Sequence, residues 1–439
     1  MSAQQPTFRE ASRFWMKLGF ISFGGPAGQI AIMHTELVGR KKWIREETFL
    51  HALNFCMLLP GPEATQLATY CGWRLHGVRG GVVAGVLFVL PSAAILWGLS
   101  FVYVTWGHVP WLAAFFYGLK PAVMAVVAAA VLRLGQKALR NGVAWGIAAA
   151  AFIGIYFWHA PFPFIVAAAA GVGFIGGRFW PDWFGVAQAS SLPRENDGRL
   201  EACATSEPSA AGTPRSIWSY SAKVLGVCGA LWAAPILAAG LWQGWDGTLA
   251  QEGVFFSKAA MVTFGGAYAV LPYVGQQAVE NFHWFTAPQM LDGLGLAETT
   301  PGPLIMVLQF VGFLGGWNQP GALPPLLAAT LGAAMTTWTT FVPCFLWIFL
   351  GAPHLERLRG VRLLNTALGA VTAAVVGVVL NFAVWFGLHT LRPGAATGAL
   401  DWFAAAVALA AFVALHRFKL NLIAVIAASG AAGLLWNWV

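Results

Sequence analysis

The stretches SFGGP at residues 22–26 and LPGPE at residues 59–63 interrupt two apolar segments, and these interruptions decide the fold. The interrupted segments cover residues 9–36 and 47–74. Each half of such a segment has about 13–15 residues and would extend about 20 Å as a helix, which is short of the ~30 Å hydrocarbon core of a bilayer. We therefore expect half-helices at these places rather than complete spans.

Both interruptions recur 241 residues later, as TFGG at residues 263–266 and TPGP at residues 300–303. They lie inside two further apolar segments, residues 252–279 and 287–315. Two helix-breaking motifs that repeat in register indicate a duplicated chain. Between the two copies 12 positions are identical without a gap, and in the first copy these are Phe14, Lys17, Phe23, Gly24, Gly25, Val38, Trp43, Leu50, Leu53, Pro60, Gly61 and Pro62.

The composition restricts the chain to a membrane protein. Of 439 residues, 58% are apolar and only 10% are charged, whereas a soluble domain carries about 25% charge. The mean hydropathy is +0.67. A soluble enzyme, a nucleic-acid binder and a disordered scaffold are excluded, and the net charge of +8 fits membrane topology better than DNA. The five cysteines show neither disulfide nor metal-binding spacing, so we expect no metal and no cofactor.

Apolar runs long enough to span a membrane predict an all-α polytopic protein. We expect residues 1–180 to form an N-terminal repeat, 181–216 a polar cytoplasmic linker, 217–243 a connecting transmembrane helix and 244–439 a C-terminal repeat. The expected spans are 81–104, 111–133, 142–158, 161–179, 218–242, 322–350, 363–388, 401–415 and 420–438.

Lysine and arginine gather in loops that we assign to the cytoplasm by the positive-inside rule. Such loops flank the first two interrupted segments, whereas the second two are flanked by loops with almost no basic residue. The first two would therefore enter and leave from inside, and the second two from outside. This predicts inverted-topology repeats, nine full spans and four re-entrant hairpins, with the N-terminus inside and the C-terminus outside. An alternative interpretation counts the hairpins as crossings and gives about 13 spans.

The interruptions have the chemistry of an anion site. A helix N-terminus carries a partial positive charge and free N–H groups, and glycine lets an anion approach the backbone closely. The hydroxyl groups beside the breaks, on Ser22, Thr263, Thr299 and Thr300, would add hydrogen-bond donors. The other interpretation is that the glycines and prolines serve only turns or close packing. The substrate-binding candidates at the breaks are Ser22, Phe23, Gly24, Gly25, Pro60, Gly61, Pro62, Thr263, Gly265, Gly266, Thr300 and Gly302.

Isolated polar residues in the apolar segments add candidates with open alternatives. Glu63 and Glu298 flank the breaks and could carry a proton, although Glu63 could equally be a partner of the helix dipole. Lys120 is either a cation in the anion pathway or a lysine paired with a carboxylate. Gln66 and Gln309 either donate to the substrate or link helices.

These residues resemble the chromate ion transporter (CHR) family, in its long two-domain form. The resemblance rests on residues 22–30, 43–44, 49–54, 59–64 and 66–70, and on the two second-half motifs. It implies a bacterial inner-membrane exporter of chromate, with sulfate as a mimic, that uses the proton motive force and gives chromate resistance. The halves differ where Pro26 and Glu63 become Ala267 and Leu304, so we expect the first half to hold more substrate contacts.

Three functions remain open at this point. The first is a proton-coupled chromate exporter, the second an uptake transporter for sulfate or another oxyanion, and the third a passive anion channel. The sequence contains no nucleophile motif, phosphate-binding loop or metal-ligand cluster that would favour an enzyme. The expected partners are chromate, sulfate, protons and the lipid bilayer, with no nucleic acid, and a homodimer is left open.

Overall fold

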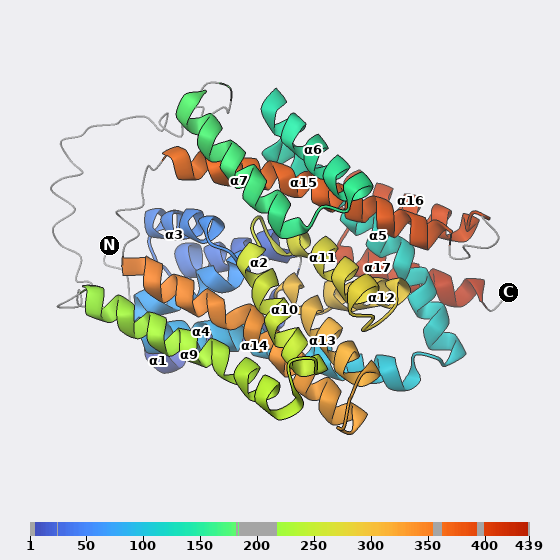
Figure 1. The fold of residues 1–439 in the computed structure, drawn as a ribbon, viewed down its shortest axis with the longest axis horizontal. Coiled ribbons are helices and arrows are strands. Elements are labelled where there is room, and N and C mark those ends of the chain that lie inside the picture. Colours follow the sequence, from blue (N-terminus) through green and yellow to red (C-terminus); the bar gives the residue numbers. More distant parts are fainter. Residues whose placement is uncertain are drawn as a thin grey trace.

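The chain is an assembly of helices, most of which lie roughly lengthwise in the molecule (Figure 1). The computed structural model describes residues 5–23, 25–180, 183, 217–353, 362–392 and 399–437, and within them every regular element is helical. The all-α expectation is confirmed. The expected linker, residues 181–216, lies outside the described residues apart from Trp183.

In the first half the helices begin and end close to the expected breaks. They are α1 (Phe8–Ile21), α2 (Gly25–His34), η1 (Thr35–Arg40), α3 (Glu46–Leu58), α4 (Glu63–Trp106), α5 (Pro110–Ala138), α6 (Gly142–Trp158) and α7 (Phe162–Phe179). The long helix α4 turns sharply at His76 and Gly77, where Gly77 has φ 64° and ψ −157°. A Cβ on Gly72 would collide with Gly80, so the two segments of α4 fold back against each other.

The second half repeats this order after the connecting helix α9 (Ile217–Gln243). Its elements are α10 (Thr248–Val262), α11 (Ala267–Gln276), η2 (Gln277–Asn281), α12 (Ala287–Thr299), η3 (Leu304–Met306), α13 (Val307–Asn318), α14 (Pro325–Gly351), α15 (Arg362–Leu391), α16 (Trp402–His416) and α17 (Leu422–Trp436). The π-helical turns η1 and η2 lie at matching places, because each follows the first hairpin of its half.

The interrupted segments are helical hairpins whose two arms return to the same end. In the fourth hairpin, Asn318 Nδ2 donates to Trp284 O at 2.7 Å, which joins the end of α13 to the start of α12. In the third, the rings of Phe255 and Tyr273 lie 5.3 Å apart. In the first, Lys41 Nζ lies 3.7 Å from Glu10 Oε1. The pairs in the fourth and first hairpins lie at the bases, and the pair in the third joins the two arms part-way along.

The long helices α4 and α14 form an antiparallel pair. A Cβ on Gly81, early in the second segment of α4, would lie 2.7 Å from Phe349 near the end of α14. Trp97 Nε1 donates to Thr330 Oγ1 at 3.2 Å near the start of α14. This pair therefore gives a common axis against which the four hairpins can be oriented.

The second and fourth hairpins approach this axis from opposite ends. The second runs from its tip toward the end of α14, because Gly61 at the tip approaches Cys344 and Phe55, further back in α3, contacts Gly351 at the end of α14. The base of the fourth lies beside the start of α14, because Gly316 contacts Ala328. Such opposed approaches are what inverted repeats require.

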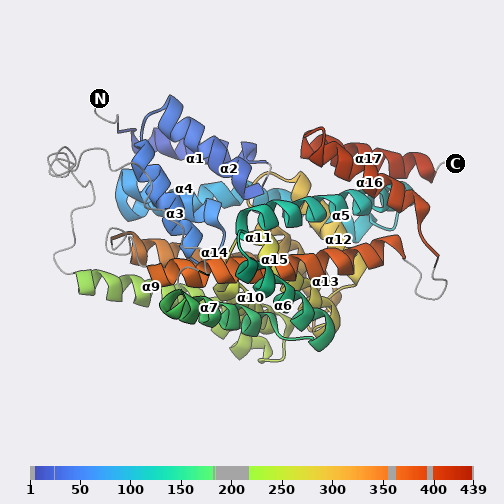
Figure 2. The same ribbon diagram turned by 90° about the horizontal axis from the view of Figure 1, so that it is seen from above.

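The last two helices of each half pack on a single helix of the other half, which is α15 or α5. Helices α6 and α7 lie against α15, and α16 and α17 lie against α5 (Figures 1 and 2). Small residues allow the close approach, because a Cβ on Gly173 would lie 2.6 Å from Ala370. On the other side Gly118 meets Ser429 and Gly433. This exchange joins the two halves into one body.

The expected number of full spans is only partly matched. All nine expected spans are helices, but only six described helices have the length and composition to cross a membrane alone. Helices α6, α16 and α17 have 17, 15 and 15 residues. At 1.5 Å per residue, 15 residues reach about 22 Å, which is short of a ~30 Å hydrocarbon core. Helices α6 and α16 have the lengths expected from the sequence, and only α17 is shorter than its apolar run at residues 420–438.

The opposed hairpin bases predict opposite accessibility for two loops. Val78→Cys and Ala322→Cys, each in a chain whose five native cysteines are replaced by alanine, should react with an impermeant maleimide from opposite faces. The cysteine of Val78→Cys should react only in inside-out vesicles, and that of Ala322→Cys only in right-side-out vesicles. Labelling of both from one face would contradict the opposed arrangement.

Candidate functional site

Two backbone hydrogen bonds join the hairpin tips in pairs, the second tip with the third and the fourth with the first. Gly61 N–H donates to Thr263 O at 2.7 Å, and Gly302 N–H donates to Ser22 O at 2.7 Å. Under the 241-residue shift these two bonds are equivalent. Gly61 and Gly302 have φ of 117° and 100°, a region that favours glycine. Each proline-glycine break is thus tied to a phenylalanine-glycine break of the other half.

Two glutamine side chains brace these junctions. Gln66 Nε2 donates to Pro60 O at 2.7 Å. Gln29 Nε2 donates to Gly302 O at 2.5 Å and lies 3.5 Å from Ser22 O. Gln29 is fully buried and was not among the sequence candidates, although, like Gln66, it is a buried amide within the first turns of a half-helix. Both residues serve the backbone of the tips.

The proline-glycine breaks are tightly packed and their central amides are occupied. A Cβ on Gly61 would lie 3.1 Å from Cys344 Sγ, midway along α14, and one on Gly302 would lie 2.5 Å from Ser92, midway along α4. Of the sequence candidates, Gly61 is therefore brought to Thr263 and Gly302 to Ser22. Because the N–H groups of Gly61 and Gly302 already have acceptors, these two cannot also bind an anion in this conformation.

The phenylalanine-glycine breaks, in contrast, face open space. No described atom lies within 4 Å of a Cβ placed on Gly25 or Gly266, and only Val375 approaches Gly265, at 3.9 Å. Gly25 is the first residue of α2, and Gly266 caps α11. The amides of a first helical turn have no acceptor within the helix. Phe23 is half-buried beside this opening, and Gly24 lies outside the described residues.

The hydroxyl groups near the tips do not all act as expected. Thr263 Oγ1 donates to Ala259 O at 2.6 Å and Thr300 Oγ1 donates to Ala297 O at 3.0 Å. Thr299 Oγ1 donates to Leu296 O at 2.8 Å. A threonine in the last turn of a helix readily bonds back to its own backbone. These three are thus not free donors here, whereas Ser22 Oγ is buried without a partner among the described residues.

Both candidate proton carriers lie at the tips and have basic neighbours on α5. Glu298, near the end of α12, accepts a hydrogen bond from the hydroxyl of Tyr268 in the first turn of α11. Arg133 interacts electrostatically with this pair. Glu63 begins α4 and interacts with Lys137, one turn beyond Arg133. Tyr268 and Arg133 were not identified from the sequence, because only the fold brings them to Glu298.

Lys120 forms an ion pair. Its Nζ lies 3.5 Å from Asp292 Oδ1, and Asp292 Oδ2 accepts a hydrogen bond of 2.8 Å from Tyr103. Of the two alternatives for Lys120, the structure favours the paired lysine. Gln309 likewise links helices, because its Nε2 donates to Ala93 O at 2.8 Å and its Oε1 accepts from Thr337 at 3.2 Å.

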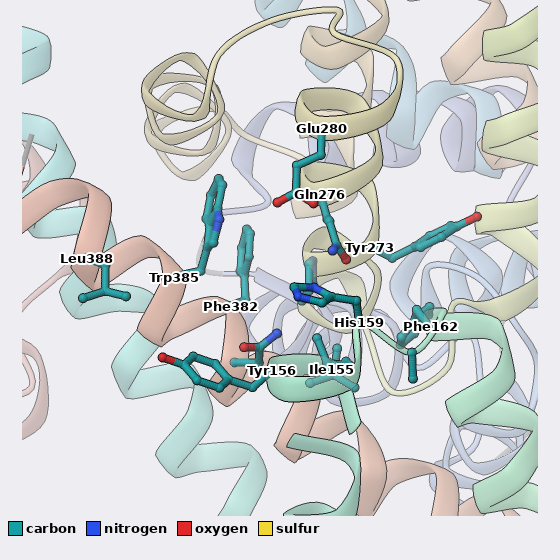
Figure 3. A pocket seen from close by; sticks show the side chains of 14 residues that line it. Ile155, Tyr156, His159, Phe162, Tyr273, Gln276, Glu280, Phe382, Trp385 and Leu388 are labelled. Carbon is teal, nitrogen blue, oxygen red and sulfur yellow. The ribbon is translucent and has the colours of Figure 1, made fainter. Parts of the chain in front are cut away.

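Two cavities lie along α11, away from the tips. One, of about 160 Å³, is lined by aromatic rings together with His159, Gln276 and Glu280 (Figure 3). The other, of about 430 Å³, contains Lys258 beside Gln251 and Gln277. None of the sequence candidates lines either cavity. In the described part of the chain no group of three or more His, Cys, Asp or Glu residues could hold a metal ion.

Comparison with known proteins identifies the family. A family model described as chromate transporter matches residues 9–174 and 251–434. The chain belongs to the chromate transporter family. The chromate transport protein of Pseudomonas aeruginosa is 32% identical over 425 residues, which cover 95% of this chain and 90% of that protein. The chromate transport protein of Cupriavidus metallidurans is 27% identical over 400 residues, covering 86% and 82%.

A further relative, the probable chromate transport protein of Synechococcus elongatus, is 27% identical over 388 residues. No solved structure matches the chain. Membership in this transporter family and the six apolar helices make the protein a multi-pass membrane protein. The two matched regions leave out residues 175–250, which include α9 and the expected linker.

The Lys120–Asp292 pair predicts a stability effect that separates pairing from substrate binding. Lys120→Met should lower the free energy of unfolding by about 3 kcal/mol, because it leaves a carboxylate buried without its cation. The double variant Lys120→Met, Asp292→Asn should recover most of this loss. Thermal unfolding of the purified single and double variants measures both. A lysine that serves only the substrate would give additive losses instead.

Proposed function

We propose that the protein exports chromate across the bacterial inner membrane, that the proton motive force drives this export, and that the cell thereby becomes resistant to chromate. The names of the relatives support chromate as the ion. The observation that carries the proposal is the pair of open helix N-termini at Gly25 and Gly265-Gly266, set within the cluster of four tips.

The site is proposed to hold a compact dianion by backbone amides. The first-turn N–H groups of α2 and α11 point out of the helix ends, and the partial positive charge of each end favours an anion. The glycines leave room for a tetrahedral oxyanion to approach closely. Ser22 Oγ can add a hydroxyl donor, because no described group occupies it. Amides of this kind do not distinguish chromate from sulfate, which we therefore expect to compete.

Outward transport agrees with the electrical driving force. A membrane potential of about 100 mV, negative inside, favours outward movement of a dianion by about 4.6 kcal/mol. An uptake transporter for sulfate would have to overcome this term. A passive channel would use it but could not move the anion against its electrochemical gradient, so uphill flux separates a channel from a coupled exporter.

Alternating access would arise from the two sets of hairpins. We propose that the halves are inverted repeats whose tips form the substrate site near the membrane midplane. The hairpins approach the α4–α14 pair from opposite ends, so separation of one set from this pair would open the site to one side only. The tip-to-tip hydrogen bonds at Gly61 and Gly302 would hold the centre together meanwhile.

Glu298 and Glu63 are the proposed proton carriers at the tips. Each lies beside a break, and each has a basic residue of α5 nearby, Arg133 for Glu298 and Lys137 for Glu63. If inward proton movement drives outward chromate movement, the proton and the dianion must occupy the site in alternation, so the carboxyl carries its proton while the dianion is absent. Proton transfer at these groups can therefore be linked to binding of the dianion.

The open glycine at the start of α2 gives a direct test. Gly25→Leu should abolish labelled chromate flux in vesicles, because the side chain would fill the space in front of the amides. Gly39→Leu is the matched control, since Gly39 also lacks close neighbours but lies at the other end of the same hairpin. Both variants should insert into the membrane. Normal flux in Gly25→Leu would remove this tip from the substrate site.

The tip carboxyls predict a change in pH dependence. Glu63→Gln and Glu298→Gln cannot ionise, so each should flatten the pH profile of chromate flux that is measured with an imposed pH gradient. The loss is expected to be larger for Glu298, which contacts Tyr268 at the start of α11. Profiles identical to that of the unaltered protein in both variants would exclude these groups as proton carriers.

A further inference from the structure

Glu252 is a buried carboxyl that none of the preceding arguments uses. It lies in the second turn of α10 and has no solvent exposure. Neither of its oxygens has a hydrogen-bond partner among the described residues. Burying a carboxylate in this way is very costly unless it is paired. In this conformation the carboxyl must therefore be in its neutral, protonated form.

The surrounding helices leave room for this side chain. A Cβ on Gly315 of α13 would lie 2.5 Å from Glu252 Oε1, and a Cβ on Gly332 of α14 would lie 2.8 Å from Oε2. Any other residue at either position would displace the carboxyl. The two glycines thus form a niche for Glu252 between α10, α13 and α14.

Two further polar groups at this niche also lack partners. A Cβ on Gly315 would lie 3.3 Å from the indole of Trp284, and Trp284 Nε1 is buried without an acceptor in the described part of the chain. Thr336 Oγ1, one turn along α14 from Gly332, is likewise buried and unpartnered. A cluster of unsatisfied polar groups is the setting in which buried water is found.

No charged group in the described part of the chain pairs with Glu252. Helix α13 has no titratable residue, and burial is the one influence on the carboxyl that the described residues reveal. On α10 itself Lys258 faces a separate cavity. The titratable groups of the other surrounding elements, none of which bonds to Glu252 in the described chain, are Tyr220, Lys223, Cys228, Asp246, Tyr268, Tyr273, Glu280, His283 and Cys344.

The packing itself does not require a carboxyl here. Under the 241-residue shift Glu252 corresponds to Ala11, which is buried at 2% exposure. The first half therefore buries a methyl group at the position where the second half buries an acid, so the carboxyl is not shared by the two halves.

We propose that Glu252 is a proton-binding site at the outer end of α10. It takes a proton from water on the outer side while α10 and α13 are separated from α14, and a carboxylate becomes a carboxylic acid. The neutral group is then buried as these helices close. The outer location of this site rests on the proposed function, in which the second set of hairpins opens outward.

Flux measurements in proteoliposomes test this role. At fixed internal pH, chromate flux by the unaltered protein should depend on external pH, by up to tenfold per pH unit as the ratio of the two forms changes. E252Q, which mimics the neutral acid, should remove this dependence. E280Q is the matched control, because Glu280 is an exposed carboxylate at the same end, and it should keep the dependence. A dependence unchanged in E252Q would overturn the proposal.

A second measurement does not rely on chromate transport. Infrared spectra of the purified protein should contain the carbonyl stretch of a protonated carboxyl that is missing in E252Q and retained in E280Q. This band should shift in D2O, because the proposed site exchanges its proton with water. A band that never shifts, or that E252Q leaves in place, would overturn the proposal even if the protein moved no chromate. If the band behaves as expected without chromate flux, the proposed function fails and the proton site stands.

Folding of the variants is itself informative. E252A reproduces the residue of the first half, so it should insert into the membrane and unfold at a temperature close to that of the unaltered protein. Failure of both E252A and E252Q to fold would make the carboxyl a structural requirement and would contradict the proposal.

Discussion

An unpaired backbone amide is very costly inside a bilayer, and the structure is organised around this constraint. Breaking a helix at mid-membrane exposes N–H and C=O groups that need partners. The tips supply them to each other, since Gly61 donates to Thr263 and Gly302 to Ser22. Each half therefore needs the other to complete its backbone hydrogen bonding. The remaining donors, at Gly25 and Gly266, are those that a substrate could use.

The two halves share a backbone design but differ in chemistry. Both contain a π-helical turn, a close glycine–glycine contact between helical segments and glycines of positive φ at their tips. Acidic groups are distributed unequally. Glu63 at a tip of the first half is replaced by Leu304, whereas the second half has Glu298 at a tip and Glu252 where the first has Ala11. A symmetric frame with unequal acids can respond differently to the two sides of the membrane.

The sequence alone predicted the breaks and the half-helices, because glycine-proline patterns recognisable in the two copies mark them. It did not show which amides would be free. Gly61 and Gly25 belong to equally conspicuous motifs, yet one donates to a carbonyl about 200 residues away and the other faces open space. The pairing of Lys120 with Asp292 and the isolation of Glu252 depend on helix packing, which no local pattern encodes. The apolar run at residues 420–438 also overestimated the length of α17.

The exchange of α6 and α7 onto α15 and of α16 and α17 onto α5 has a consequence for biosynthesis. When the ribosome has completed the first half, α6 and α7 have been made but their docking surface on α15 has not. Their buried residues, such as Ala148 and Ile165, must wait among lipids or insertion factors until the second half emerges. Assembly of this protein is thus a late, concerted event, and a truncated first half would need a second copy, or a separately encoded counterpart, to shield the same surface.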